Sequence, residues 1–332
     1  MLQENNPFNP DIELSANSNF RILVSVIGYQ SQGESIIIRC YDTAKDISLH
    51  CIVIDSYKLG NRNITVELLK DDFNIKHIDV LCWTHPHLDH SKGLEELIET
   101  FCDNNTKFIL PDFLYNKPSD LTVALNDEEK ACVEKIFTHN ETTKLSTSSI
   151  KVPSFNHVLI QHAQFSAIGE APISLNIYAI TPIDSILEYY YWKDEHDIDP
   201  NELSVSLLVD VNGYKLLFGA DSINTHIDGI SSNLLEGCRF VKIPHHGSDT
   251  SDHLIDRIAN LDTACTTVYH IKKDLPLKSI IERYQKEKKA DVYCTGSYEK
   301  CDEMYGAINY SIELSKYSYD VELINSACLL DK

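Results

Sequence analysis

The chain has 332 residues, of which 43% are hydrophobic, so it is long enough to bury a large core, and a disordered chain is excluded as the default. Acidic residues outnumber basic residues 50 to 29, and the formal charge of -21 opposes binding to the phosphate backbone of long nucleic acids. This balance counts against a general DNA-binding module.

The opening MLQENNPFNPDIEL is polar, and no later stretch supplies about 18 continuous apolar residues. We therefore expect a soluble, cytoplasmic protein with no membrane association. The ten cysteines form no C-x-x-C pair, so in a reducing compartment they are interpreted as small apolar core residues rather than as disulfides or thiolate zinc ligands. They are Cys40, Cys51, Cys82, Cys102, Cys132, Cys238, Cys265, Cys294, Cys301 and Cys328.

The first third of the chain has the composition of β-strands. Three segments rich in Val and Ile, separated by Gly, Gln, Asp and Thr, are RILVSVIGY (21–29), ESIIIRCY (34–41) and LHCIVIDSY (49–57). They predict an antiparallel or mixed sheet. HIDVLCW (77–83) then predicts a buried strand, and KGLEELIETFC (92–102) predicts a helix because its apolar residues recur at helical spacing.

Strands and helices alternate in the rest of the chain. Residues 126–138 predict a capped helix, and strands 205–211 and 214–220 flank Asn212-Gly213, a strong hairpin signal. Strand 238–243, helix 252–261, strand 266–271, helix 276–289 and strands 290–295 and 307–314 follow. We expect one domain over 21–332, preceded by an extension over 1–20.

The segment 184–200, DSILEYYYWKDEHDIDP, interrupts this alternation with three tyrosines and a tryptophan beside acidic residues. It is interpreted as an aromatic and acidic insertion. An aromatic patch that covers a core edge, a pocket wall and a flap that binds a protein partner are the three alternatives.

The sequence THPHLDH places His85, His87, Asp89 and His90 directly after the predicted buried strand. On an extended loop alternate residues point the same way, so His85 and His87 can share one metal ion while Asp89 and His90 face another. Imidazole and carboxylate ligands suit zinc, with manganese or iron as substitutes. Four ligand-type residues in six positions favour a metal site over merely polar loop residues.

Further ligands have to come from distant strand ends. Asp221 in KLLFGADS follows an apolar strand and can bridge two ions, although an isolated aspartate there would simply close a turn. His245 and His246 in KIPHHGSDTS leave another strand. The loop that follows them, with Ser248 and Thr250, can offer hydrogen-bond donors to an anionic substrate.

These segments, in this order, resemble the metallo-β-lactamase superfamily and its branch typified by the hydrolase domain of the ComEC competence protein. SQGESIII, IVID, NELSVSLLVDVNGYKLLFGAD and KKADVYCTGS also resemble segments of that branch, and the resemblance spans about residues 21–312. It implies an α+β fold, a four-layer αββα sandwich with a two-metal site at one edge. It also implies that His85 and His87 hold one ion, Asp89 and His90 the other, and that Asp221 bridges them.

The chain departs from that pattern at two positions. Asn201 stands where many superfamily members have a histidine ligand, as in much of the ComEC-like branch, and it would be a weaker or water-mediated ligand. Leu275-Pro276 stands where the branch has His-Pro, which supplies the last ligand of the second ion. His270 is either the substitute ligand or an ordinary strand residue.

Two divalent ions, zinc first and manganese second, would hold a water between them and lower its pKa toward neutrality. Asp89 or Asp221 would orient the resulting hydroxide. His245 or His246 would stabilise the developing charge or protonate the leaving oxygen, and the residues leave open which of them does so.

Three functions are compatible with this chemistry. The first is a phosphodiesterase or nuclease-like hydrolase that acts on a small nucleotide, a cyclic oligonucleotide, a phosphorylcholine-like ester or a nucleic-acid end. The second is a non-catalytic or weakly catalytic subunit of a multi-protein system, which the departure at Leu275 favours. The third is a hydrolase of a thioester, lactone or lactam.

Overall fold

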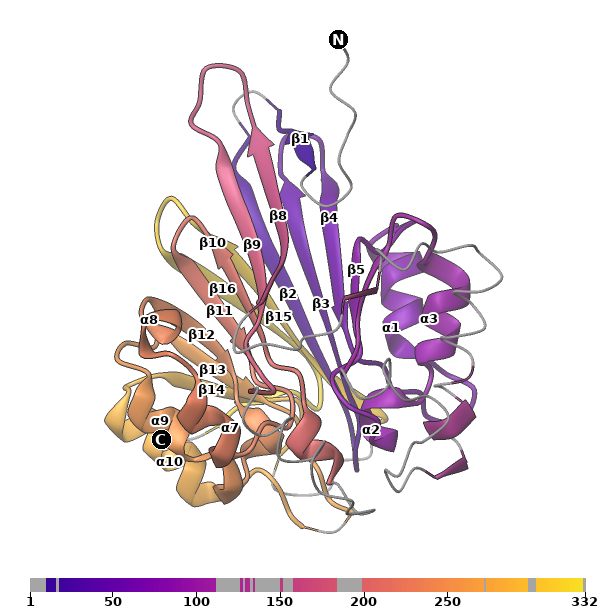
Figure 1. Ribbon diagram of the computed structural model, residues 1–332, viewed down its shortest axis with the longest axis vertical. Coiled ribbons are helices and arrows are strands. Elements are labelled where there is room, and N and C mark those ends of the chain that lie inside the picture. The colour runs from indigo at the N-terminus through magenta and orange to yellow at the C-terminus, as the bar shows by residue number, and fades with distance from the viewer. Residues whose placement is uncertain are drawn as a thin grey trace.

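The computed structural model describes residues 10–15, 18–111, 126, 127, 129–131, 134, 150, 151, 158–183, 199–271, 273–297 and 303–330. Most of the predicted helix 126–138 and residues 184–198 of the predicted insertion lie outside the described residues. The described residues form two large sheets with helices on their outer faces (Figure 1).

One sheet has eight strands in the order β16-β15-β2-β3-β4-β5-β6-β7. The strands from β16 to β4 pair antiparallel, and those from β4 to β7 pair parallel. Their bounds are β2 (Phe20–Tyr29), β3 (Glu34–Asp42), β4 (Ile47–Ile54), β5 (Val80–Cys82), β6 (Lys107–Ile109), β7 (Ile150–Lys151), β15 (Tyr305–Glu313) and β16 (Ser318–Asn325).

The other sheet has nine strands in the order β1-β8-β9-β10-β11-β12-β13-β14-β17. The strands from β11 to β14 pair parallel, which brings their carboxyl ends to one edge. The bounds are β1 (Asp11–Glu13), β8 (Val158–Ser166), β9 (Ile173–Ala179), β10 (Leu207–Val211), β11 (Tyr214–Phe218), β12 (Cys238–Lys242), β13 (Thr263–Thr266), β14 (Asp291–Cys294) and β17 (Cys328–Leu329).

Alternation along the strands builds three hydrophobic layers. In β3, Ile36 and Ile38 pack between the two sheets, whereas Ile37 packs under helices on the outer face. The outer face of the nine-stranded sheet is likewise covered, with Val241 of β12 packed against Leu254 and Ile281. Because side chains of a strand alternate between faces, both sheets are buried on both sides, and the four layers are helix, sheet, sheet and helix.

The helices divide between the two outer faces (Figure 1). The eight-stranded sheet is covered by α1 (Ile64–Glu67), the π-helical turn η1 (Leu68–Asp72) and α3 (Leu94–Phe101), and α2 (Leu88–Ser91) lies at its edge. On the nine-stranded side are α7 (Asn224–Gly229), α8 (Ser232–Leu235), α9 (His253–Arg257) and α10 (Lys278–Glu287), with the 3₁₀ turns η3 (Pro200–Leu203), η4 (Pro244–Gly247) and η5 (Asp249–Ser251) in loops.

The α+β sandwich predicted from the sequence is confirmed, and so is the hairpin at Asn212-Gly213. Both turn residues have positive φ, 51° and 87°, as a two-residue hairpin turn requires. The prediction of a strand over 266–271 was wrong. The strand runs over Thr263–Thr266, because pairing with β12 covers Thr263–Cys265 and pairing with β14 ends at Thr266. After it, Tyr269 pairs with Leu275 instead.

The cysteines in the described part of the chain are free, and all of them except Cys102 and Cys328 are buried, which agrees with their predicted place in the core. Within that same part, no helix has the length and apolar composition needed to cross a bilayer.

Candidate metal centre

The centre lies at the carboxyl ends of parallel strands from both sheets. Asp55 directly follows β4, and Thr84 begins the loop after β5 that carries His85 and His87. From the other sheet, Asp221 follows β11 and His246 follows β12. The two edges are joined directly, because the backbone N–H of Val205 donates to the carbonyl of Thr84 at 3.0 Å.

Asp55 fixes the orientation of two histidine rings. The Thr84 hydroxyl donates its single proton to Asp55 Oδ2 at 2.7 Å. Thr84 Oγ1 also lies 3.0 Å from His85 Nδ1, and because its own proton is already used, it accepts the ring proton of His85 there. His90 Nδ1 donates directly to Asp55 Oδ2 at 2.8 Å. In both rings Nδ1 therefore carries a proton, and Nε2 is the nitrogen that faces the centre.

These Nε2 atoms face the other ligand-type side chains. His85 Nε2 lies 3.1 Å from His87 Nδ1 and 3.8 Å from Asp221 Oδ2. His90 Nε2 lies 3.6 Å from Asp89 Oδ2 and 3.5 Å from Asp221 Oδ1. The THPHLDH cluster thus converges, as the sequence predicts, and Asp221 reaches it from the second sheet.

His246 approaches the same point from the opposite side. Its Nε2 lies 3.3 Å from Asp89 Oδ2 and 3.6 Å from Asp221 Oδ1. The ring of Tyr269 stacks on it, with centroids 5.3 Å apart and 25° between the planes. His245 and His246 both have left-handed backbone, with φ of 49° and 51°, as does Asp55 at 56°. Such strain is typical of functional sites.

Three buried atoms at this point have no hydrogen-bond partner: His90 Nε2, His246 Nε2 and Asp221 Oδ1. Unpaired buried polar atoms are costly, and these three are two imidazole nitrogens and a carboxylate oxygen, all ligand types of divalent cations. His85, His90 and Asp221 each place a ligand atom within 4.8 Å of the others. The residues therefore fit a bound metal ion.

The electrostatics of the centre also suit a cation. Although burial opposes it, the imidazoles of His246 and His90 hold the pKa of Asp221 well below its usual range. Burial alone would lower the pKa of His90, but Asp221 and Asp89 raise it well above the ordinary value. Burial lowers the pKa of His85, which stays neutral. Ionised carboxylates thus face one another across a buried space where positive charge is stabilised.

Asn201 lies at the wall of the cavity beside the centre, on η3. The turn is capped by Asp199, whose carboxylate accepts from the backbone N–H of Asn201 at 3.0 Å. The side-chain Oδ1 of Asn201 is buried and has no hydrogen-bond partner. Asn201 thus lines the same cavity as Asp89 and Asp221, and the role of its amide oxygen as a weak or water-mediated ligand stays a prediction.

His245 lines the cavity, whereas Ser248 and Thr250 do not. The Thr250 hydroxyl donates its one proton to Ser248 Oγ at 3.1 Å. In its second hydrogen bond, 2.7 Å from His245 Nδ1, it therefore accepts the ring proton of His245. Ser248 is fully buried. The two residues predicted to bind substrate therefore hold the ring of His245 and do not reach the cavity.

His270 is not brought into the centre. Its Nδ1 pairs with Asp274 Oδ1 at 3.2 Å, its backbone N–H donates to the carbonyl of Ser31 at 2.7 Å, and it belongs to neither metal-type group found among the described residues. Leu275, in contrast, lines the cavity with its buried side chain. An apolar side chain thus occupies the wall where the resembled branch has a histidine.

The cavity beside the centre has a volume of about 360 Å³, within the range of small-molecule sites. Among the described residues that line the cavity, Lys273 is the one with a permanently charged, positive side chain. Glu129 is buried there, and burial raises the pKa of its carboxyl. The full lining is Gln32, His87, Leu88, Asp89, Asn126, Glu129, Asn201, Asp221, His245, His246, Tyr269, Ile271, Lys273 and Leu275.

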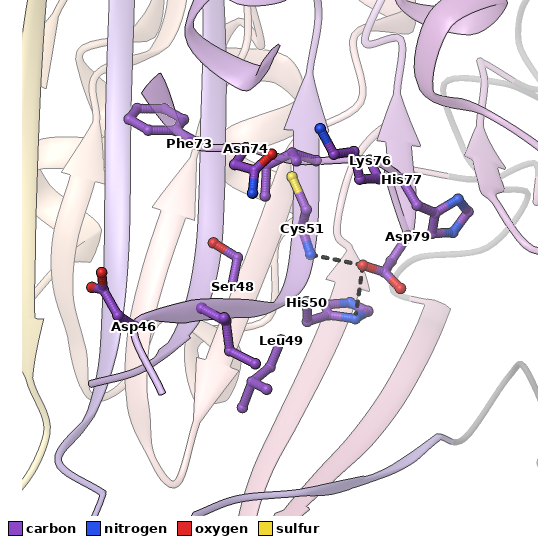
Figure 2. Close-up of a pocket in the computed structure, with 12 residues that line it drawn as sticks. Asp46, Ser48, Leu49, His50, Cys51, Phe73, Asn74, Lys76, His77 and Asp79 are labelled. Atoms are coloured by element: carbon purple, nitrogen blue, oxygen red, sulfur yellow. Dashed lines mark hydrogen bonds and ion pairs between the residues drawn. The ribbon is translucent and has the colours of Figure 1, made fainter. Parts of the chain in front are cut away.

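A second cavity of about 420 Å³ lies at the start of β4, the other end of that strand from Asp55. Figure 2 shows Asp79 beside His50 and the backbone of Cys51. Asp79 Oδ2 accepts from Cys51 N at 2.8 Å and lies 3.4 Å from His50 Nδ1. This cavity contains neither of the metal-type groups found in the described part of the chain. Three buried atoms of its lining, Ser48 Oγ, His50 Nδ1 and His77 Nδ1, have no hydrogen-bond partner. The two histidine nitrogens each lie 3.4 Å from one carboxylate oxygen, of Asp79 and of Asp103 respectively.

Sequence reasoning missed several residues of the site. Asp55 carries the same signal as Asp221, an acidic residue at the end of an apolar strand, and could have been found. Glu34, Lys242 and Thr267 lie behind His246 and have no local signal in the sequence. Glu34 is hydrogen-bonded to Lys242, 208 positions away, and to Thr267, 233 positions away, so neighbouring residues do not reveal these pairs.

Residues 50–107 match the family model of the metallo-beta-lactamase superfamily. A comparison with curated proteins found no match. The matched segment includes the last five residues of β4, all of β5, Asp55 and the whole THPHLDH cluster. Residues 50–107 are therefore similar to the metallo-β-lactamase superfamily, and the α+β sandwich in which they lie is consistent with the fold of that superfamily.

Proposed function

We propose that the protein is a metal-dependent hydrolase, and that it is a phosphodiesterase or nuclease-like enzyme of the ComEC-like branch. One observation carries the proposal: His90 Nε2, His246 Nε2 and Asp221 Oδ1 are buried without a hydrogen-bond partner. Asp221 Oδ1 lies 3.5 Å from His90 Nε2 and 3.6 Å from His246 Nε2. The family match over residues 50–107 supports hydrolytic chemistry.

The centre would hold divalent cations through His85, His87, Asp89, His90, Asp221 and His246. Such ions, zinc or manganese, supply Lewis acidity and lower the pKa of water. The chain itself holds the imidazole tautomers through Asp55 and Thr84, and it excludes bulk water by burying Asp89 and Asp221.

His245 is the residue best placed for proton transfer to a leaving group. Its Nδ1 donates to Thr250, which leaves Nε2 as the nitrogen that can take up a proton and pass it on, and the residue lines the cavity. His246 faces Asp89 and Asp221 and is assigned to the metal ligands instead. This resolves the two histidines into separate roles within the proposal.

A small phosphodiester is the proposed substrate. The cavity of about 360 Å³ accepts a small molecule or a strand end, and Lys273 offers the positive charge that a phosphate oxygen requires. The overall charge of -21 disfavours an extended nucleic acid.

The test is a substrate panel with the chain stripped of metal and then supplied with zinc or manganese. We expect turnover of bis-p-nitrophenyl phosphate and little turnover of nitrocefin or a thioester, and we expect loss of phosphodiester turnover in His245→Gln. Turnover confined to the carbonyl substrates would overturn the phosphodiester assignment.

A second candidate is a non-catalytic subunit, which the presence of Leu275 in the cavity wall favours. Metal content separates the two. About two ions per purified chain, the number expected of a two-metal hydrolase, support the enzyme, and a chain purified without chelator that holds none supports the subunit.

A further inference from the structure

Two oppositely charged side chains are buried directly behind His246. Glu34, the first residue of β3, is 1% exposed, and Lys242, the last residue of β12, is fully buried. The Lys242 ammonium is ion-paired with Glu34 Oε2. Burying such a pair costs about as much as the attraction returns, so it is a weak source of stability and calls for another explanation.

The pair is linked to His246 through a hydroxyl. Thr267, which follows β13, donates its single proton to Glu34 Oε2 at 2.7 Å. The same Oγ1 lies 2.8 Å from His246 Nδ1, so there it must accept, and the ring proton is on Nδ1. The other nitrogen, Nε2, then presents its lone pair to Asp89 and Asp221.

Lys242 fixes the direction of this chain of hydrogen bonds. The Lys242 ammonium can only donate hydrogen bonds, so Glu34 must be the acceptor in this pair. The Glu34 carboxylate then has no proton to donate to Thr267. Glu34 Oε1 also lies 4.0 Å from His90 Nδ1. The geometry repeats, for His246, what Asp55 and Thr84 do for His85 and His90.

We propose that Glu34, Lys242 and Thr267 form a positioning relay that holds the proton of His246 on Nδ1 and so presents Nε2 to a divalent cation. All three lie outside the segment 50–107 that matches the superfamily model. The hydrogen-bond relay needs no metal, whereas its consequence for metal affinity rests on the proposed function.

The first test reads the tautomer of the metal-free protein by long-range ¹H–¹⁵N correlation of labelled histidines, with His246 assigned from the spectrum of His246→Gln. We expect Nδ1–H in the native chain and in Thr267→Ser, and a gain of Nε2–H in Thr267→Val. Thr263→Val, which removes a buried hydroxyl from β13, the strand that precedes Thr267, is the matched control and should leave His246 unchanged.

The double variant Glu34→Leu, Lys242→Met gives a second reading with the same expected outcome if Thr267→Val fails to fold. It removes both charges together, so no charge is left unpaired. The Thr267 hydroxyl is then free to donate to His246 Nδ1, and we expect Nε2–H. Nε2–H in the native chain, or Nδ1–H retained in both Thr267→Val and the double variant, would overturn the relay.

The second test measures affinity for Zn²⁺ by chelator competition. Loss of a group that orients a ligand histidine typically weakens metal binding about 10-fold to 100-fold, and we expect this for Thr267→Val but not for Thr267→Ser or Thr263→Val. If the native chain binds no metal while the tautomers behave as expected, the proposed function fails and the relay stands. If metal binds and the tautomers do not respond, the relay fails alone.

Discussion

Asp221 uses its two carboxylate oxygens toward different histidines. Oδ2 faces His85, and Oδ1 faces both His90 and His246. Its backbone N–H donates to Ser204 Oγ at 3.0 Å, which fixes the residue after the sharp turn at Ala220. One side chain thus reaches ligands from both sheets.

Replacing Asp221 by Asn keeps the shape and removes the negative charge. We expect turnover to fall at least about 100-fold and bound metal to drop, since the charge that balances the cations is lost. Elemental analysis and phosphodiesterase assays measure both. Asp210→Asn, on β10, is the control and should behave as the native chain. Native turnover in Asp221→Asn contradicts the assigned centre.

Lys273 is expected to act on substrate binding rather than on the chemical step. In Lys273→Gln we expect KM for bis-p-nitrophenyl phosphate to rise about 5-fold to 10-fold with kcat little changed, because a rim cation contributes about 1 kcal/mol toward an anion. Lys278→Gln, exposed at the start of α10, is the control. Equal effects of the two variants would remove the specific role of Lys273.

His226 on α7 makes stability depend on pH. It is fully buried, its Nδ1 accepts from Ile183 N at 3.5 Å, and burial lowers its pKa from 6.5 to about 4. The unfolded chain therefore takes up a proton as pH falls below 6.5, and the folded chain does so only near pH 4. The free energy of unfolding is therefore highest above pH 6.5, and it falls by about 3 kcal/mol between pH 6.5 and pH 4.

His226→Asn keeps an acceptor for Ile183 and cannot titrate. We expect its free energy of unfolding, measured in urea, to fall less than that of the native chain over the same pH range. His253→Asn replaces an exposed histidine and should follow the native pH dependence. Identical pH profiles for all three proteins would contradict the role of His226.

The ligand cluster could be read from the sequence because His85, His87, Asp89 and His90 are neighbours in the chain, and Asp221 because it follows an apolar strand. The tautomer-fixing contacts could not. Glu34 meets Lys242 and Thr267 only after the two sheets pack, and a buried lysine in an apolar strand carries no sign of its partner.

The loop after β12 positions His245 and His246 through an unusual backbone. Both have left-handed φ, and Gly247 follows with φ of 79°. A Cβ on Gly247 would lie 2.8 Å from Pro276 Cβ, so the glycine lets the loop pack against the start of the α10 segment. The loop therefore needs both the left-handed conformation and the close approach.

We expect Gly247→Ala to be destabilised by about 2–4 kcal/mol, the sum of a left-handed alanine and an overpacked contact. Gly169→Ala is a matched control, because Gly169 also has positive φ, 84°, but has nothing near its Cβ position. It should lose only about 1 kcal/mol. Urea unfolding measures the difference, and equal losses would show that the contact with Pro276 is unimportant.

Several elements could be predicted and others could not. The long strands β2, β3 and β4 and the β10–β11 hairpin have strong Val/Ile and Asn-Gly signals. The helices α7 and α8, of six and four residues, are too short for a helical period to stand out. The strand predicted over 266–271 has β-rich composition, but pairing with neighbouring strands ends at Thr266.

At the scale of the whole molecule, the centre joins the two sheets. His85, Asp89 and His90 come from the eight-stranded side, and Asp221 and His246 from the nine-stranded side. Bound cations would therefore link the two halves of the sandwich and stabilise the folded state over the unfolded chain.

Removal of metal by a chelator should lower the free energy of unfolding of the native chain. At a free metal concentration of 100 times Kd, binding contributes about 2.7 kcal/mol. We expect this difference between metal-loaded and chelated protein in thermal or urea unfolding, and none in Asp221→Asn. Equal stability with and without metal in the native chain would contradict a cation shared by both sheets.

The position of the ligands along the chain has a consequence for biosynthesis. A nascent chain that has emerged through residue 110 already contains all the imidazoles of the THPHLDH cluster, yet it lacks Asp221 and His246. Such an intermediate on the ribosome has histidines without the opposing ligands of the second sheet. Capture of a cation by the full ligand set would therefore have to wait until translation has passed residue 246, which would make loading a late event in maturation.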